Sequence, residues 1–203
     1  LPSFNSVPAG DLADGSGWTK FRYTQMQLSE TYEDVYTAVT IDLGEKENIH
    51  PADKQPVGSR LADIAREKVY GASIHSLSPQ AKTAADQGRV TVTFQGLNDS
   101  LQLKNGDAIR EVRLCDKYGK WTAAEAVIDG NTLVIPYTGE APIGVSYCDR
   151  NYVEAATLFD GALPVAPFRF QWKEAEEEPG KQEGELIAYY NFADSANPGK
   201  DAS

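Results

Sequence analysis

The sequence predicts an α/β segment followed by a small antiparallel β-sandwich. Up to Gly71, apolar residues recur at helical spacing on both sides of one β-branched run. After Gly71, short runs with near alternation are separated by turn dipeptides. A helix, a strand and a helix in succession form one unit of an α/β sheet, whereas evenly spaced short strands are typical of a sandwich. We therefore expect one unit at residues 1–71 and a second at residues 72–172.

The first unit is predicted to contain two helices and one strand. Residues 18–28 predict a helix, because Trp18, Phe21, Gln25 and Leu28 recur at helical spacing on one face, with Lys20 and Arg22 off that face. Residues 36–44 are β-branched and end in a glycine, which is typical of a buried strand. Residues 57–70 form the second helix, which ends at Gly71. The polar run 45–54 is the loop between the strand and this helix.

The second unit is predicted from five short strand-like runs. They are residues 89–94, 111–115, 124–128, 132–135 and 144–148. The turn dipeptides between them include Asn105-Gly106, Tyr118-Gly119 and Asp129-Gly130. Residues 173–185 are charged and poor in apolar side chains, so we expect an acidic linker there. Residues 186–203 open with an apolar run and are predicted to be the first strand of a truncated downstream β module.

Composition excludes several classes of partner. The net charge of −11 disfavours binding to nucleic acids and to anionic membrane surfaces. No apolar run has the length needed to span a bilayer. We expect no cofactor and no metal, because the two cysteines and two histidines have no metal-ligand spacing and no phosphate-binding glycine motif occurs. Cys115 and Cys148 form either one disulfide or two buried thiols.

His50 is the best candidate for chemistry. It follows the predicted buried strand, lies in the polar loop and precedes Pro51. Ligands and catalytic groups collect at this edge of an α/β sheet, and a nearby carboxylate leaves one imidazole nitrogen free to act as a base. The alternative is an ordinary histidine on a surface loop. His75 follows the second helix and is expected to be an exposed linker histidine.

No nucleophile is evident. A Gly-x-Ser-x-Gly elbow is absent from the sequence, and Ser16 and Ser100 lie in the wrong context for one. A set of aromatic residues forms either core and interface packing or a platform on which sugars stack. These residues are Trp121, Tyr147, Tyr152, Phe168, Phe170 and Trp172.

Two stretches resemble the sialate O-acetylesterase family of the SGNH hydrolase class. The first contains VTIDLGE at residues 39–45 and IHPADKQPVGSRLA at residues 49–62, behind a Trp-led helix with an Arg-x-x-Gln pattern. The second contains APIGVSY at residues 141–147 and LFDGALPVAPFR at residues 158–169. Residues 186–203 resemble the opening strand of a laminin-G-like or concanavalin-like module.

The resemblance implies that residues 1–71 close a flavodoxin-like sheet of a carbohydrate esterase. In this class a serine attacks an acetyl ester and a histidine relays the proton. The histidine maps onto His50, and the acid three residues earlier maps onto Glu47, with Asn48 and Asp42 as competitors. The serine is expected on an N-terminal part outside this chain.

The resemblance also implies an acetylated sugar or sialic acid as substrate, and a secreted or periplasmic location. The alternative function is a non-catalytic β-sandwich that binds glycan or packs against a catalytic domain. A purely structural domain is the third interpretation.

Overall fold

The computed structural model describes residues 17–177, in which two helices and eleven strands form. The expectations for Ser16, for the end of the acidic linker and for the downstream module at residues 186–203 lie outside the described residues. No helix in the described part of the chain has the length and apolar character needed to cross a membrane.

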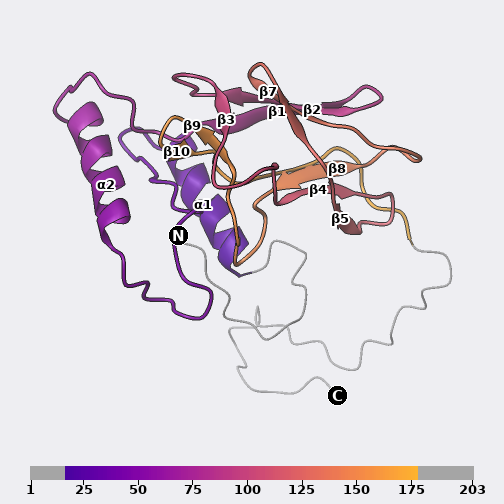
Figure 1. Ribbon diagram of the computed structural model, residues 1–203, viewed down its shortest axis with the longest axis horizontal. Coiled ribbons are helices and arrows are strands. Elements are labelled where there is room, and N and C mark those ends of the chain that lie inside the picture. Colours follow the sequence, from indigo (N-terminus) through magenta and orange to yellow (C-terminus); the bar gives the residue numbers. More distant parts are fainter. Residues whose placement is uncertain (1–16, 178–203) are drawn as a thin grey trace, which may run out of the picture.

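Both predicted helices are present. Helix α1 spans Trp18–Thr31, and helix α2 spans Gln55–Lys68. Pro56 occupies the first turn of α2, where its missing N–H and fixed φ are tolerated. Basic residues in the last turn of α2 complement the helix dipole. Helix α2 lies at one side of the molecule, whereas α1 lies closer to its middle, beside the sheets (Figure 1).

The face of α1 that carries the four predicted residues is buried only in part, because Trp18 and Gln25 are half-buried. Phe21 is 53% exposed and Leu28 is 44% exposed, whereas Thr19 and Arg22 are buried. Arg22 is buried because its guanidinium donates hydrogen bonds of 2.6 and 2.8 Å to the backbone carbonyls of Arg150 and Asn151. This burial lowers the pKa of Arg22 to about 10. The helix therefore turns a charged side chain toward the β region and an apolar side outward.

A second polar contact fixes α1 on the β region. Asp149 is buried and accepts a hydrogen bond of 3.1 Å from the Tyr23 hydroxyl and one of 3.3 Å from Arg169. Burial raises the pKa of the Asp149 carboxyl. Buried charges are tolerated when they are paired in this way.

The strand predicted at residues 36–44 is wrong. Residues 35–40 are irregular and residues 41–42 form a turn. A strand requires a neighbour that shares its ladder of hydrogen bonds, and no residue from 36 to 43 has one within the described range. The burial expected of this run is nevertheless correct, because Val39 and Ile41 are 8% and 1% exposed.

The β region consists of three antiparallel sheets. Their strand orders are β1-β2-β7-β6, β10-β9-β3 and β11-β8-β4-β5. The strands are β1 (Gln80–Asp86), β2 (Val90–Gln95), β3 (Leu101–Leu103), β4 (Val112–Cys115), β5 (Trp121–Ala123), β6 (Val127–Asp129), β7 (Thr132–Ile135), β8 (Gly144–Tyr147), β9 (Leu158–Asp160), β10 (Leu163–Pro164) and β11 (Phe168–Gln171). Four of the five predicted runs correspond to β2, β4, β7 and β8, whereas the run at 124–128 overlaps β6 only in its last two residues. Two expectations stay predictions: that residues 1–71 close the sheet of an SGNH-type hydrolase, and that residues 72–172 form a β-sandwich.

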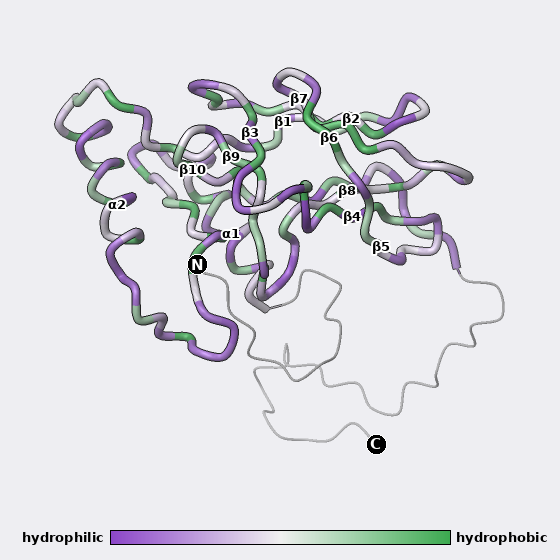
Figure 2. The backbone as a smooth tube through the Cα atoms, in the orientation of Figure 1, coloured by the Kyte–Doolittle hydropathy of each residue, from purple (hydrophilic) through white to green (hydrophobic). Residues whose placement is uncertain are grey.

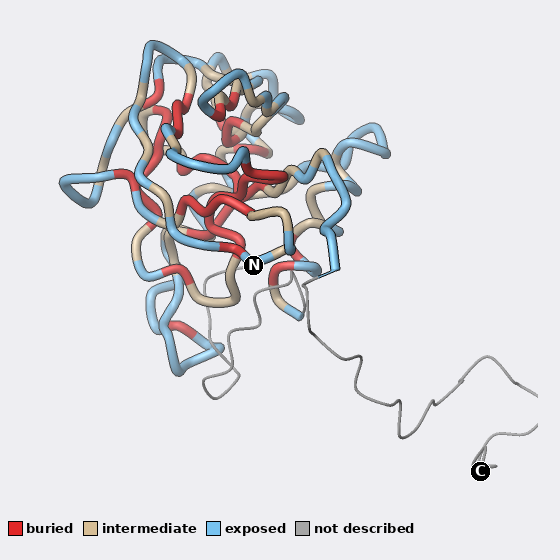
Figure 3. The backbone as a smooth tube through the Cα atoms, turned by 90° about the vertical axis from the view of Figure 1, so that its right-hand side faces the viewer, coloured by how far each residue is buried: buried red, intermediate tan, exposed pale blue. Residues whose placement is uncertain are grey.

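One hydrophobic core joins these sheets to the chain before them. Val92 and Leu133 from the first sheet and Tyr147 from the third are completely buried, and Val39 and Ile41 belong to the same cluster. Buried backbone concentrates in the middle of the molecule, with exposed loops around it (Figure 3), and apolar residues follow the strands (Figure 2). A boundary near residue 72 stays a prediction, and packing crosses it.

The two cysteines are buried free thiols. Cys115 pairs in register with Gly144, whereas Cys148 follows Tyr147 at the other end of β8. The two thiols are therefore separated along the strands by more than a disulfide can span.

Candidate functional site

The loop that carries His50 is shaped by the carboxylate of Glu45. Its Oε1 accepts a hydrogen bond of 2.6 Å from the backbone N–H of Ala52, and its Oε2 accepts one of 3.1 Å from the Asn48 amide. These hydrogen bonds, with that from Ala52 the larger cause, lower the pKa of Glu45. One carboxylate thus connects the two ends of the loop around His50.

Asn48 fixes the backbone of His50 directly. Its Oδ1 accepts a hydrogen bond of 2.9 Å from the His50 N–H. An asparagine that binds the backbone two residues further on is a recurrent turn motif. Pro51 is buried, whereas residues 44–50 are exposed, so the loop projects from an anchored base.

The imidazole of His50 is exposed, and neither of its nitrogens has a hydrogen-bond partner among residues 17–177. Glu47 is exposed as well and makes no hydrogen bond or ion pair with the described part of the chain. The two residues predicted as base and acid therefore share one loop without touching. The imidazole can therefore still form a hydrogen bond with a hydroxyl group.

Asp42, the competing acid, is already occupied. Both of its oxygens accept hydrogen bonds of 2.6 Å from Arg60 in α2, and Arg60 also donates to the Val39 carbonyl. The side chains of Arg60 and Asp42 are 14% and 10% exposed. Asp42 thus anchors α2 to the segment before the loop. Among residues 17–177, Glu47 is then the carboxylate nearest to His50 in sequence that has no partner.

Sequence reasoning missed Glu45 and Arg60 as organising residues. Four acids lie close to His50 in sequence, and no feature of the sequence separates Glu45 from the others. They are Asp42, Glu45, Glu47 and Asp53. Arg60 lies in the resembling stretch, on the side of the second predicted helix opposite its apolar face, where an exposed charge is the usual expectation. Its role depends on Asp42, which is eighteen positions away, and spacing alone does not reveal such a pair.

Two other expectations about side chains are decided by the structure. His75 is not an exposed linker histidine: it is half-buried, and its Nε2 is inaccessible and has no partner among the described residues. Trp121, Tyr147 and Phe168 are buried, which confirms core packing for these three aromatics. The rings of Tyr147 and Phe168 lie 5.7 Å apart between centroids.

Ser100 makes no hydrogen bond to His50 in the described part of the chain. It is exposed in the turn before β3, in the β region. Ser16 lies outside the described residues.

Comparison with known proteins gives a match among solved structures. No protein-family model and no curated protein matches the chain. The chain is similar to a carbohydrate acetylesterase from Xanthomonas citri, with a TM-score of 0.76 and 31% sequence identity over 84% of this chain. The chain spans 40% of the length of that structure. The described residues therefore have a carbohydrate esterase-like fold, built mostly of antiparallel sheets with two helices.

Proposed function

We propose that this chain is part of a serine-type carbohydrate O-acetylesterase, in which His50 is the general base. The observation that carries the proposal is the similarity to a carbohydrate acetylesterase at 31% identity over 84% of the chain. The free imidazole in an exposed, pre-shaped loop supports the role of His50. The nucleophilic serine belongs to a part of the enzyme outside residues 1–203.

In the proposed reaction, His50 takes the proton from the serine hydroxyl as its oxygen attacks the acetyl carbonyl. The imidazolium then gives this proton to the leaving sugar oxygen, which leaves an acetyl-serine. Water that His50 deprotonates releases acetate and restores the serine. An imidazole suits both directions because its unperturbed pKa is near 6.5.

Glu47 is the proposed acid partner of His50. Its free carboxylate would bind the second imidazole nitrogen, hold the tautomer and stabilise the imidazolium. The glutamate is one methylene longer than the aspartate found at this position in the class. The hydrogen bonds made by Glu45 and Asn48 hold the loop in which this pairing would occur.

The proposed partner of the chain is the α/β part that carries the nucleophile. Twelve large apolar side chains are exposed among the described residues, and nine of them lie between Phe21 and Tyr70. They include Ile49, which precedes His50 and is 48% exposed. These exposed apolar side chains on α1, α2 and the segment between them would be covered if the catalytic part packed there.

The proposed substrate is an acetylated sugar, with acetylated sialic acid as the finer proposal from the resembling stretches. A secreted or periplasmic location is proposed with it.

The deciding experiment measures acetate release from an acetylated sugar. It uses the longer polypeptide that includes this chain and the nucleophile. His50→Ala is expected to lower turnover by a factor on the order of a thousand or more, with the melting temperature unchanged. Lys54→Ala, in the same exposed loop, is the control and should keep turnover. Normal turnover in His50→Ala, or clear activity of residues 1–203 alone, would contradict the proposal.

A further inference from the structure

A polar cavity lies where four segments of the chain meet. Its volume is about 160 Å³. It is bounded by α2, by the connector that follows α2, by the turn between β2 and β3, and by the turn between β9 and β10. The side chains that matter for its chemistry are Arg60, Asp63, His75, Asn98 and Asp160. None of them belongs to the His50 loop.

Two of these side chains, Arg60 and Asp160, line the cavity but already bind other groups of the protein. Arg60 is held by Asp42 and by the Val39 carbonyl, as described above. Both carboxylate oxygens of Asp160 accept backbone hydrogen bonds, from Asn98 at 2.7 Å and from Asp99 at 3.0 Å. The charges at these two positions are thus satisfied within the protein.

Three other side chains retain unused hydrogen-bonding capacity. Nε2 of His75 is buried without a partner, and the side-chain amide of Asn98 makes no hydrogen bond to a described residue. Asp63 uses Oδ1 to accept from Arg66 and keeps Oδ2 free. A buried nitrogen without a partner is costly, and such groups are usually explained by a bound molecule. The adjoining cavity is polar and large enough to hold one.

The chemistry of the three free groups selects the class of ligand. An anion would meet the carboxylates of Asp63 and Asp160. The described residues contain no cluster of three or more side chains suited to a metal ion. An imidazole, an amide and a carboxylate oxygen together offer both donors and acceptors, which matches hydroxyl groups, because each hydroxyl both donates and accepts. The volume is close to that of a cavity of about 150 Å³ known to admit benzene, which has the ring size of a sugar without its hydroxyl groups.

We propose that this cavity binds one neutral sugar ring through Asp63, His75 and Asn98. The site is an accessory site, and its existence does not depend on His50 being the catalytic base. It would hold a neighbouring residue of a glycan on the side of the molecule where α2 meets the β region.

The test is a titration of the isotope-labelled 203-residue chain, followed by its amide NMR signals. Glucose, galactose and N-acetylglucosamine are added separately up to high millimolar concentration. At least one is expected to give saturable shifts at Ser76, Asn98 and Gly161. Asp63→Asn and Asn98→Ala should each weaken the affinity by about fivefold, the effect of one lost hydrogen bond.

Two controls make the outcome decisive. Asp129→Asn changes an exposed aspartate at the end of β6 and should leave the affinity unchanged. His50→Ala should also leave it unchanged, which separates this proposal from the esterase mechanism. The proposal is overturned if no sugar gives saturable shifts, which would mean that only water occupies the cavity. It is also overturned if only calcium chloride or sodium sulfate shifts these amides, or if both cavity variants bind sugar normally.

Discussion

Arg60 and Asp42 form a two-pronged ion pair, Nη1 to Oδ1 and Nη2 to Oδ2, each at 2.6 Å. The planar guanidinium matches the carboxylate in both hydrogen bonds, which gives geometric specificity as well as energy. This pair connects α2 to the segment that leads into the His50 loop. Through this pair, α2, which follows the loop in sequence, fixes the segment that precedes the loop.

Loss of Arg60 is expected to destabilise the protein. Arg60→Ala leaves the Asp42 carboxylate mostly buried without its partner, so the free energy of unfolding should fall by about 2–4 kcal/mol. Urea denaturation measures the change. Arg66→Ala is the matched control on the same helix, because Arg66 pairs with Asp63 in an exposed position, with side chains 60% and 46% exposed. That variant should lose about 0.5 kcal/mol or less. Equal losses in the two variants would show that the Arg60 pair has no special role.

Tyr147→Phe should destabilise the core although it removes one oxygen only. The buried hydroxyl of Tyr147 accepts hydrogen bonds from the backbone N–H groups of Thr157 at 3.2 Å and of Leu158 at 2.9 Å. Phenylalanine leaves both N–H groups buried and unsatisfied, at an expected cost of about 1–3 kcal/mol. Thermal unfolding measures the loss. Tyr118→Phe, on an exposed turn, should melt like the parent, and a Tyr147→Phe melt that also matches the parent would refute the assignment.

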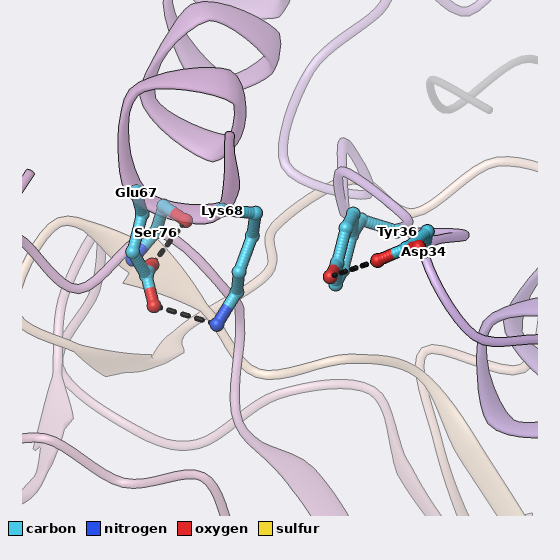
Figure 4. A network of polar contacts seen from close by, with 5 residues as sticks. All are labelled: Asp34, Tyr36, Glu67, Lys68 and Ser76. Atoms are coloured by element: carbon cyan, nitrogen blue, oxygen red, sulfur yellow. Dashed lines mark hydrogen bonds and ion pairs between the residues drawn. The ribbon is translucent and has the colours of Figure 1, made fainter. Parts of the chain in front are cut away.

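The Glu67 carboxylate is expected to make stability depend on acid. It accepts a hydrogen bond of 2.6 Å from Lys68 and two from Ser76, which lower its pKa from 4.5 to about 2 (Figure 4). Because the folded pKa is lower than the unfolded one, this stabilisation is present above about pH 4.5 and is lost as the pH falls toward 2.

Glu67→Gln should therefore flatten the decline of the free energy of unfolding between about pH 4.5 and 2. Denaturant titrations at several pH values measure the slope. Glu125→Gln, an exposed acid in the β region, should leave the slope as it is. An unchanged slope in Glu67→Gln would place the acid sensitivity elsewhere.

The acid partner of His50 is distinguished by two substitutions in the complete esterase. Glu47→Gln should lower turnover less than His50→Ala, because a carboxylate orients the imidazole and does not react. Asp42→Asn should act mainly on stability, since Asp42 is bound by Arg60. Turnover and melting temperature are measured for both. A silent Glu47→Gln together with an Asp42→Asn that lowers turnover without loss of stability would move the acid to Asp42.

The sequence predicted helices and strands better than it predicted the tertiary contacts that these elements make. The two helices were predicted from the helical spacing of their side chains, which the local backbone geometry imposes. Both helices are present within the described residues. The turn dipeptides also follow from local preference: Asn105 and Gly130 adopt φ of 59° and 57°, which asparagine and glycine tolerate best. Strand β1 was missed because its residues Gln80–Asp86 include no large apolar or aromatic side chain. It is held by its pairing with β2.

In the candidate site, too, some features follow from the sequence alone and others only from the tertiary structure. The sequence alone determined the polar loop with His50 and Glu47, the turn dipeptides between strands and the two helices. Each of these features depends on residues within a few positions of one another. The tertiary structure decided that Arg22 faces inward, that Asp42 belongs to Arg60 and that His75 borders a cavity. Each of these depends on groups from 12 to more than 100 positions away, such as the carbonyl of Arg150 for Arg22. Burial of a charged or polar side chain is favourable only where such a distant partner satisfies it, and folding alone brings the two together.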